Sequence, residues 1–246
     1  MGIQTPSWTN GNGSADPTRG TQREHAVPEK SSAKVQDERF RFMLTFRIDG
    51  DLRFISHLDT VRLFRRACAR AGLPVRYSQG FNPQPRIALP LPRPVGVASD
   101  ADAILIETEH WIDPADILKR LQEQTPAGIS LIQARRMLPG ERPQPDRVRY
   151  RLALDESAPD DLQERIDRIV QADSLPVVRK DPKARSTRTI DIRPYLLEMH
   201  IDGAAVEFTL RVTGNGTARP SELAELLGYG ARSINHKIRR LDIQWR

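Results

Sequence analysis

The chain has a single cysteine, Cys68, among its 246 residues. One thiol excludes an internal disulfide and any iron–sulfur site built from several cysteines of this chain. The five histidines show no metal-ligand spacing with one another or with Cys68. The sequence therefore predicts neither a bound metal nor a cofactor. We expect Cys68 itself in the core, on the apolar stripe of a helix.

Long apolar runs are also missing. No window approaches the 18 or so apolar residues that a bilayer-spanning helix needs, and the N-terminus lacks the regions of a signal peptide. No phosphate-binding glycine loop or nucleophile elbow is present. We therefore expect no membrane association and a cytoplasmic location.

Lysine is absent between residues 39 and 93, where eleven arginines stand against three aspartates. Between residues 94 and 134 the balance reverses, because seven acidic residues oppose only Lys119 and Arg120. This polarised distribution indicates a surface that faces a polyanion.

Hydrophobic periodicity divides the chain into a tail and two units. Residues 1–37 are rich in small polar residues and proline, which predicts a disordered tail. Residues 38–138 follow the order strand, helix, strand, strand, helix, strand, and residues 147–246 approximate the same order after a linker over 139–146. We therefore predict an α+β protein of two tandem ferredoxin-like (βαββαβ) units with antiparallel sheets.

The first helix of the first unit is rich in arginine. Ser56, with Asp59 three residues later, is typical of a helix start. The expected buried stripe is Leu58, Val61, Phe64, Cys68 and Ala71. Opposite this stripe we expect a ladder of guanidinium groups from Arg62, Arg65, Arg66 and Arg70. Each guanidinium can bind two phosphate oxygens at once, which favours a phosphate-binding surface. An ordinary solvated helix face is the alternative.

The loop over residues 78–85 is stiffened by two prolines and carries a glycine at a reversal. One hypothesis is that Phe81 stacks on an unpaired base while Asn82 and Gln84 read its edge, as in single-stranded RNA recognition. The alternative is that Phe81 plugs the core beneath the loop. Further along the chain, a second basic set shares one face of a strand: Arg147, Arg149 and Arg151.

Two strings carry a resemblance to a known family: FISHLD at residues 54–59 and SQGFNP at residues 78–83. They are similar to the radical-SAM-linked protein family, a bacterial domain of unknown function, in its standalone form. The resemblance implies a radical-SAM enzyme as partner and supplies no catalytic residue. The expected architecture also resembles that of the CRISPR repeat-processing endoribonucleases.

These observations lead to three functional hypotheses. The first is a non-catalytic RNA-binding accessory module that works with a radical-SAM enzyme. The second is a metal-independent endoribonuclease in which His57, at the entrance of the first helix, acts as general base; a structural role for His57 is the alternative. The third is a protein–protein adaptor that docks its basic face on the radical-SAM partner.

Overall fold

The structure is a computed structural model that describes residues 39–156, 158–181, 186–230 and 234–246. The predicted tail over 1–37 lies outside the described residues. The first half contains β1 (Phe40–Ile48), a short 3-10 helix η1 (Gly50–Phe54), α1 (His57–Arg70), β2 (Ile87–Ala88), β3 (Ala98–Thr108), α2 (Pro114–Gln122) and β4 (Ile129–Arg136). The second half contains β5 (Pro145–Ala153), α3 (Leu162–Gln171), β6 (Pro176–Asp181), β7 (Ser186–Asp191), η2 (Arg193–Tyr195), β8 (Leu196–Ile201), β9 (Ala205–Arg211), α4 (Pro220–Leu226), η3 (Ile234–Lys237) and β10 (Ile238–Trp245).

Both helices of the first half begin directly after a capping residue, Ser56 for α1 and Asp113 for α2. The Ser56 side chain accepts a hydrogen bond from the backbone N–H of Asp59 at 3.1 Å, so the predicted start of α1 is confirmed. Asp113 caps α2 in the same way through Ala115 at 2.8 Å, with Pro114 in the first turn. These caps satisfy backbone donors that have no partner inside the helix.

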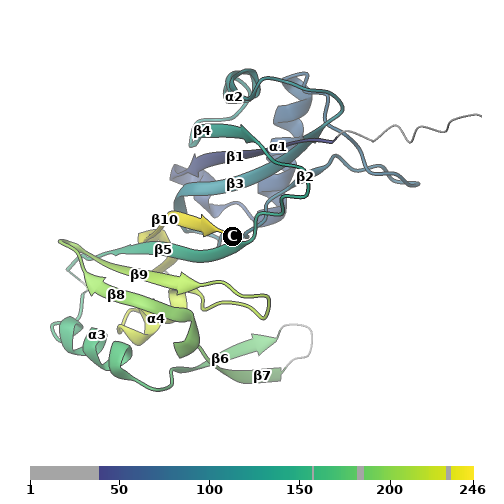
Figure 1. Cartoon of the computed structure of the whole chain (residues 1–246). Coiled ribbons are helices and arrows are strands. Elements are labelled where there is room, and N and C mark those ends of the chain that lie inside the picture. The colour runs from purple at the N-terminus through teal and green to yellow at the C-terminus, as the bar shows by residue number, and fades with distance from the viewer. Residues whose placement is uncertain (1–38, 157, 182–185, 231–233) are drawn as a thin grey trace, which may run out of the picture. The chain divides into compact units, whose positions relative to one another are not determined.

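One large sheet runs through both halves in the order β4-β1-β3-β10-β5-β9-β8, with β2 paired to β3. All neighbours are antiparallel except β10 and β3, which run parallel through Arg239↔Ala98 and Arg240↔Ser99. The α+β class is therefore confirmed, and the sheet is mostly antiparallel. Instead of two separate sheets, the last strand of the chain lies between the halves and joins them (Figure 1).

Each half has its own hydrophobic core. In the first half α1 and α2 pack on β1, β3 and β4 around Phe42, Phe46 and Phe64. In the second half α3 and α4 pack on β5, β8 and β9 around Tyr150 and Phe208. Figure 1 shows the two helix pairs at different ends of the sheet. Residues Glu38–Arg246 nevertheless form one compact unit.

The buried stripe of α1 differs from the predicted one. Its buried residues are Thr60, Val61, Leu63, Phe64, Ala67 and Cys68. Leu58 is 63% exposed, so its assignment to the core is wrong. Successive residues of a helix are rotated by about 100° about its axis. The buried Leu63 and Ala67 therefore place the centre of the buried face on the side of α1 away from Leu58. Cys68 is buried as predicted, and desolvation raises the pKa of its thiol to about 12.

Among the described residues, none of the helices combines the length and apolar character needed to cross a bilayer.

Candidate nucleic-acid interface

The four arginines of α1 have different environments. Arg62 forms an exposed ion pair with Asp59, its Nη1 lying 2.9 Å from Oδ1. Arg70 donates from Nη2 to the backbone oxygen of Gln124 at 2.6 Å, which fastens α1 to the turn that follows α2. Arg66 is exposed and makes no hydrogen bond or ion pair within the described part of the chain. The four arginines therefore do not form one ladder. Arg62 and Arg66 face solvent, whereas Arg70 forms a hydrogen bond that stabilises the fold.

Arg65 connects α1 to the proline-rich loop. Its Nη1 donates to Oε1 of Gln84 at 2.9 Å. The loop thus lies beside the basic helix, although the two are separated in sequence by the end of the helix and an extended segment. The sequence predicted a site on each, and the structure makes them one surface.

The loop forms a projecting arm, which we define as residues 77–85. Its two sides are held together by a bridge between Tyr77 and Pro85 and by two hydrogen bonds between Ser78 and Gln84. Gly80 turns the tip with φ of +133°, a conformation that favours glycine. Figure 1 shows the arm extending away from the sheet after α1.

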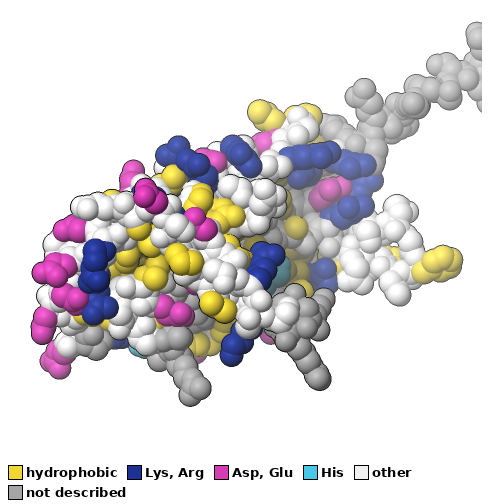
Figure 2. Space-filling model, turned by 90° about the horizontal axis from the view of Figure 1, so that it is seen from below, with side chains coloured by type: hydrophobic (Ala, Val, Ile, Leu, Met, Phe, Trp, Pro, Cys, Tyr) yellow, Lys and Arg dark blue, Asp and Glu magenta, His cyan; other side chains and the backbone are white. Residues whose placement is uncertain are grey.

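Phe81 lies at the tip of the arm and is fully exposed, at 106% of its reference area. The alternative in which Phe81 plugs the core is therefore wrong. Asn82 is exposed next to it, and Tyr77 is half exposed at the base of the arm. In Figure 2 hydrophobic side chains mark the tip of the arm, and Lys and Arg side chains gather near its base. An aromatic ring and cations thus share one surface.

The second basic set belongs to a different part of the sheet. On β5, Arg151 donates to Oε1 of Glu207 at 2.9 Å and pairs with Asp202. Arg149 lies 3.8 Å from the same Glu207, and Arg147 lies 3.3 Å from Asp146. Carboxylates therefore neutralise much of this set, which weakens it as a phosphate site.

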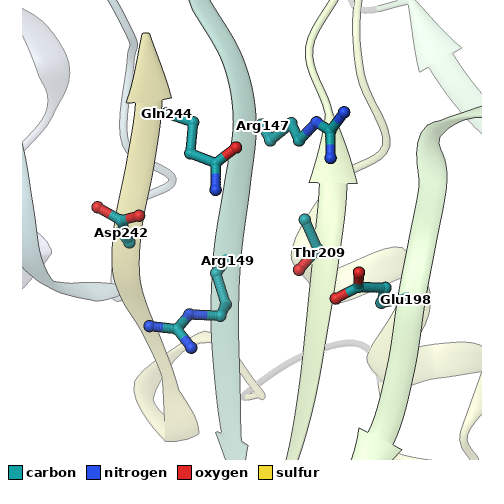
Figure 3. Close-up of a pocket in the computed structure, with 6 residues that line it drawn as sticks. All are labelled: Arg147, Arg149, Glu198, Thr209, Asp242 and Gln244. Atoms are coloured by element: carbon teal, nitrogen blue, oxygen red, sulfur yellow. The ribbon is translucent and has the colours of Figure 1, made fainter.

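Arg147 and Arg149 border a hollow of about 300 Å³ on the sheet surface, which Figure 3 shows in close-up. The hollow is completed by Glu198, Thr209, Asp242 and Gln244. Two cations and two carboxylates give it no excess charge of either sign. Such a mixture does not favour a polyanion over other polar ligands.

His57 is the first residue of α1 and is partly exposed. Its Nδ1 is buried and has no hydrogen-bond partner among the described residues. The neighbouring Asp59 carboxylate accepts from Ser56 and Arg62 and makes no hydrogen bond to Nδ1 of the ring. A base–carboxylate pair of the kind that supports general-base catalysis is thus not formed by these residues. The part of the chain that the structure describes also includes no cluster of His, Cys, Asp and Glu that would hold a metal ion.

One buried ionic group was not anticipated from the sequence. Asp102 on β3 lies 3.2 Å from Nε of Arg93 and 2.7 Å from Nη1 of Arg240 on β10, and all three side chains are buried. Arg93 also donates to the backbone oxygens of Arg53 and Val97. This group fastens the two halves together. Arg93 and Asp102 are 9 residues apart, but nothing in the sequence marks Arg240, 138 residues after Asp102, as their partner.

Residues 41–220 match the model of a family described as "Uncharacterized protein conserved in bacteria (DUF2344)". The chain belongs to this family. The family description names no activity, and the matched region contains α1, the arm and β5. No curated protein matches the chain.

Two solved structures show weak similarity. One is titled "Crystal Structure of a Cbf5-Nop10-Gar1 Complex", with 11% identity over 82% of this chain and a TM-score of 0.36. This chain spans about half, 48%, of that matched chain. The other is an unknown protein from Galdieria sulphuraria, with 14% identity over 85% of this chain and 98% of that chain, and a TM-score of 0.24. Scores this low carry no argument about fold or function.

Proposed function

We propose that this protein is a non-catalytic RNA-binding accessory protein that works beside a radical-SAM enzyme in the cytoplasm. The observation that carries the RNA-binding part is the hydrogen bond from Arg65 to Gln84, which joins the basic helix to the exposed arm. The radical-SAM partner rests on the resemblance of the FISHLD and SQGFNP strings alone.

The exposed ring of Phe81 supports recognition of unpaired bases. An apolar ring surrounded by water contributes nothing to the stability of the fold. The hydrogen bonds at the base of the arm hold the ring in place before binding, which lowers the entropy cost of a contact. Stacking of a base on such a ring contributes about 1–3 kcal/mol.

The neighbouring arginines supply the backbone contacts. Arg62 and Arg66 face solvent on α1, and Arg65 keeps further N–H donors beyond the one given to Gln84. A bound phosphate can replace the Asp59 carboxylate as the partner of Arg62 at low cost, since exposed ion pairs contribute about 0–1 kcal/mol. We assign the phosphate contacts to these three arginines and not to Arg70.

We also infer that the two halves are ferredoxin-like units in tandem. In the first half the strands lie side by side in the order β4-β1-β3-β2, and in the second half in the order β10-β5-β9-β8. If the four strands of each half are numbered along the chain, both orders read 4-1-3-2. This common order supports the inference. In the second half the β6–β7 hairpin is an insertion into this order. The basic helix and the arm then occupy the first crossover of the first unit.

The test is binding of the full chain to structured RNA, single-stranded RNA and duplex DNA at two salt concentrations. We expect Arg62→Glu with Arg66→Glu to weaken RNA binding and to lower the salt slope by about 2, without unfolding the protein. The matched control is Lys180→Glu with Arg188→Glu on the β6–β7 hairpin, which makes the same change of charge on exposed residues. Equal losses in both double variants would show general attraction and contradict the α1 surface.

The same binding reactions, run on gels, test the endoribonuclease and the protein–protein adaptor. RNA cleavage that disappears in His57→Ala would replace the accessory role with the endoribonuclease. Absence of RNA binding at low salt, together with co-purification of a protein partner that Arg62→Glu and Arg66→Glu abolish, would replace it with the protein–protein adaptor.

A further inference from the structure

We propose that a hollow at the base of the arm is a nucleotide-binding pocket, with an apolar floor for the base, Arg41 and Arg86 for the phosphate, and Glu107 for the base edge. This inference rests on the proposed function and deepens it. The hollow measures about 390 Å³, which lies within the range of about 300–1,000 Å³ of small-molecule sites.

The floor of the pocket comes from two paired strands. Ile87 and Ala88 of β2 lie opposite Ile106 and Leu105 of β3 in antiparallel register. These four residues line the hollow together with Pro85 of the arm. The pairing of β2 with β3 fixes the position of this apolar surface. Ile87 and Ile106 belong to the buried core on the other face of the sheet, so the open floor is formed by Ala88, Leu105 and Pro85. This apolar surface suits the face of a planar base.

The small side chain of Ala88 is exposed at the wall of the hollow. The space beside it is therefore open to solvent. A larger side chain at this position would occupy the pocket without disturbing the buried core, which makes Ala88 the natural site for a blocking substitution.

Two cations flank the floor. Arg86 is exposed and has no ion pair or hydrogen bond from its side chain within the described residues. Arg41 is held in place because its Nη1 donates to the backbone oxygen of Glu141 at 2.7 Å, and its remaining donors are left for a ligand. A guanidinium that is already positioned binds a phosphate with little loss of side-chain entropy.

Glu107 gives the pocket its preference among bases. Its side chain is mostly buried, and its Oε1 lies 3.5 Å from Nε of Arg76, a separation longer than that of a close ion pair. The carboxylate accepts hydrogen bonds only. Guanine presents two adjacent N–H donors on its Watson–Crick edge, whereas uracil presents one donor between two carbonyl oxygens. The pocket therefore favours a guanine nucleotide over a uracil nucleotide.

Gln84 connects this pocket to the α1–arm surface. It lines the hollow and accepts the hydrogen bond from Arg65. A nucleotide in the pocket thus lies next to the arginines that we assign to the RNA backbone. The ligand is a nucleotide of bound RNA or a free nucleotide, and the chemistry of recognition is the same for both.

The experiment uses the full chain in calorimetric titrations with GMP, UMP and ribose 5-phosphate, and fluorescence anisotropy with a short single-stranded RNA. The variants are Ala88→Phe, which fills the pocket, and Arg86→Ala, which removes an exposed cation. Arg211→Ala on β9 is the matched control, since Arg211 is also exposed and its side chain has no partner in the part of the chain that the structure describes. Thermal melting establishes that each variant is folded.

We expect GMP to bind about tenfold more tightly than UMP, and ribose 5-phosphate to bind least. Ala88→Phe abolishes GMP binding, Arg86→Ala weakens it about tenfold, and Arg211→Ala leaves it unchanged. A parallel loss of RNA affinity in Ala88→Phe identifies RNA as the source of the nucleotide. GMP binding that Ala88→Phe removes, in a protein that does not bind RNA, keeps the pocket as a free-nucleotide site and overturns the proposed function.

Absence of GMP binding, combined with RNA affinity that neither Ala88→Phe nor Arg86→Ala changes, would overturn the pocket. The RNA-binding proposal would remain open in that case, because it depends on Arg62 and Arg66 and is decided by their own variants.

Discussion

At the scale of single residues, two phenylalanines show how position decides role. Phe64 is completely buried and packs against Phe46 with ring centroids 4.8 Å apart. Phe81 has no such packing and is entirely exposed. Phe64 lies in the arginine-rich helix and Phe81 in the loop over residues 78–85, both of which the sequence analysis singled out. The residue type alone does not tell which of the two phenylalanines is buried.

The two rings therefore predict opposite responses to truncation. Phe64→Ala is expected to lower the free energy of unfolding by about 3–5 kcal/mol, because it leaves a cavity. Phe81→Ala is expected to change it by less than about 0.5 kcal/mol. The same Phe81→Ala should weaken binding of single-stranded RNA by about 1–3 kcal/mol through lost stacking. Urea denaturation and anisotropy measure both effects. A stability loss in Phe81→Ala near that of Phe64→Ala would contradict the exposed position.

A second residue-scale prediction concerns the buried carboxylate. Asp102→Ala leaves the guanidinium groups of Arg93 and Arg240 buried without a counter-charge, so we expect a loss of about 3–5 kcal/mol. Asp100, two residues away on the same strand, pairs with Arg47 and Arg239 near the surface. Asp100→Ala should cost about 0–1 kcal/mol. Equal costs in chemical denaturation would show that the buried group does not hold the halves together.

At the scale of elements, the turn from α2 into β4 packs closely against the end of β1. Gly128 has φ of +95°, and a Cβ atom there would lie 2.9 Å from the backbone oxygen of Asp49. The backbone N–H of Asp49 donates to the oxygen of Gly128 at 2.9 Å, so the two segments cannot separate freely. Glycine is thus required both by conformation and by space.

Gly128→Ala is expected to lower the free energy of unfolding by about 3 kcal/mol, as the sum of a left-handed backbone and a close contact. Gly140 is the control, because its φ is +80° and a Cβ atom added there would meet no described atom within 4 Å. Gly140→Ala should cost only about 1–2 kcal/mol, from conformation alone. Thermal or urea denaturation of the two variants isolates the contact with Asp49.

Prediction from the sequence succeeded best for elements whose signal is local. The order of strands and helices in the first half and the Ser56 cap of α1 depend on neighbours in the chain, and both were correctly predicted. The buried face of α1 was only partly correct, because Leu58 and Leu63 have the same hydrophobicity and only packing against the sheet decides which is covered. The exposure of Phe81 was left open for the same reason.

At the scale of the whole molecule, β10 makes the two halves depend on each other. It pairs with β3 of the first half and β5 of the second. We therefore expect residues 38–246 to unfold in one cooperative transition, although the chain was predicted to contain two units. Native-state hydrogen exchange measures the free energy of opening for each backbone amide. With increasing denaturant, the values for the amides of β1 and of β9 should converge on one common value. Two separate values would support independent folding of the halves.

The junction also carries a pH dependence. Asp49, after β1, accepts a hydrogen bond from Arg239 on β10, which lowers the pKa of Asp49 below its ordinary value of 3.8. A carboxyl with a depressed pKa stabilises the folded state above that ordinary value, and this contribution is lost as the pH falls through the folded pKa. Asp49→Asn should thus lower the melting temperature at about pH 7, and this loss should shrink as the pH falls below 3.8. A loss that stays constant across this range would exclude the ionised pair as its cause.

The sequence by itself determined the α+β class, the element order of the first half with the Ser56 cap of α1, the burial of Cys68 and the polarity of charge along the chain. Each of these depends on residues that are close in sequence. The tertiary structure decided which arginines are available, that α1 and the arm form one surface, and that β10 lies between the halves. These features depend on contacts such as Arg65 with Gln84 and Asp102 with Arg240. Local propensity does not encode such contacts, because they form only when distant segments pack together.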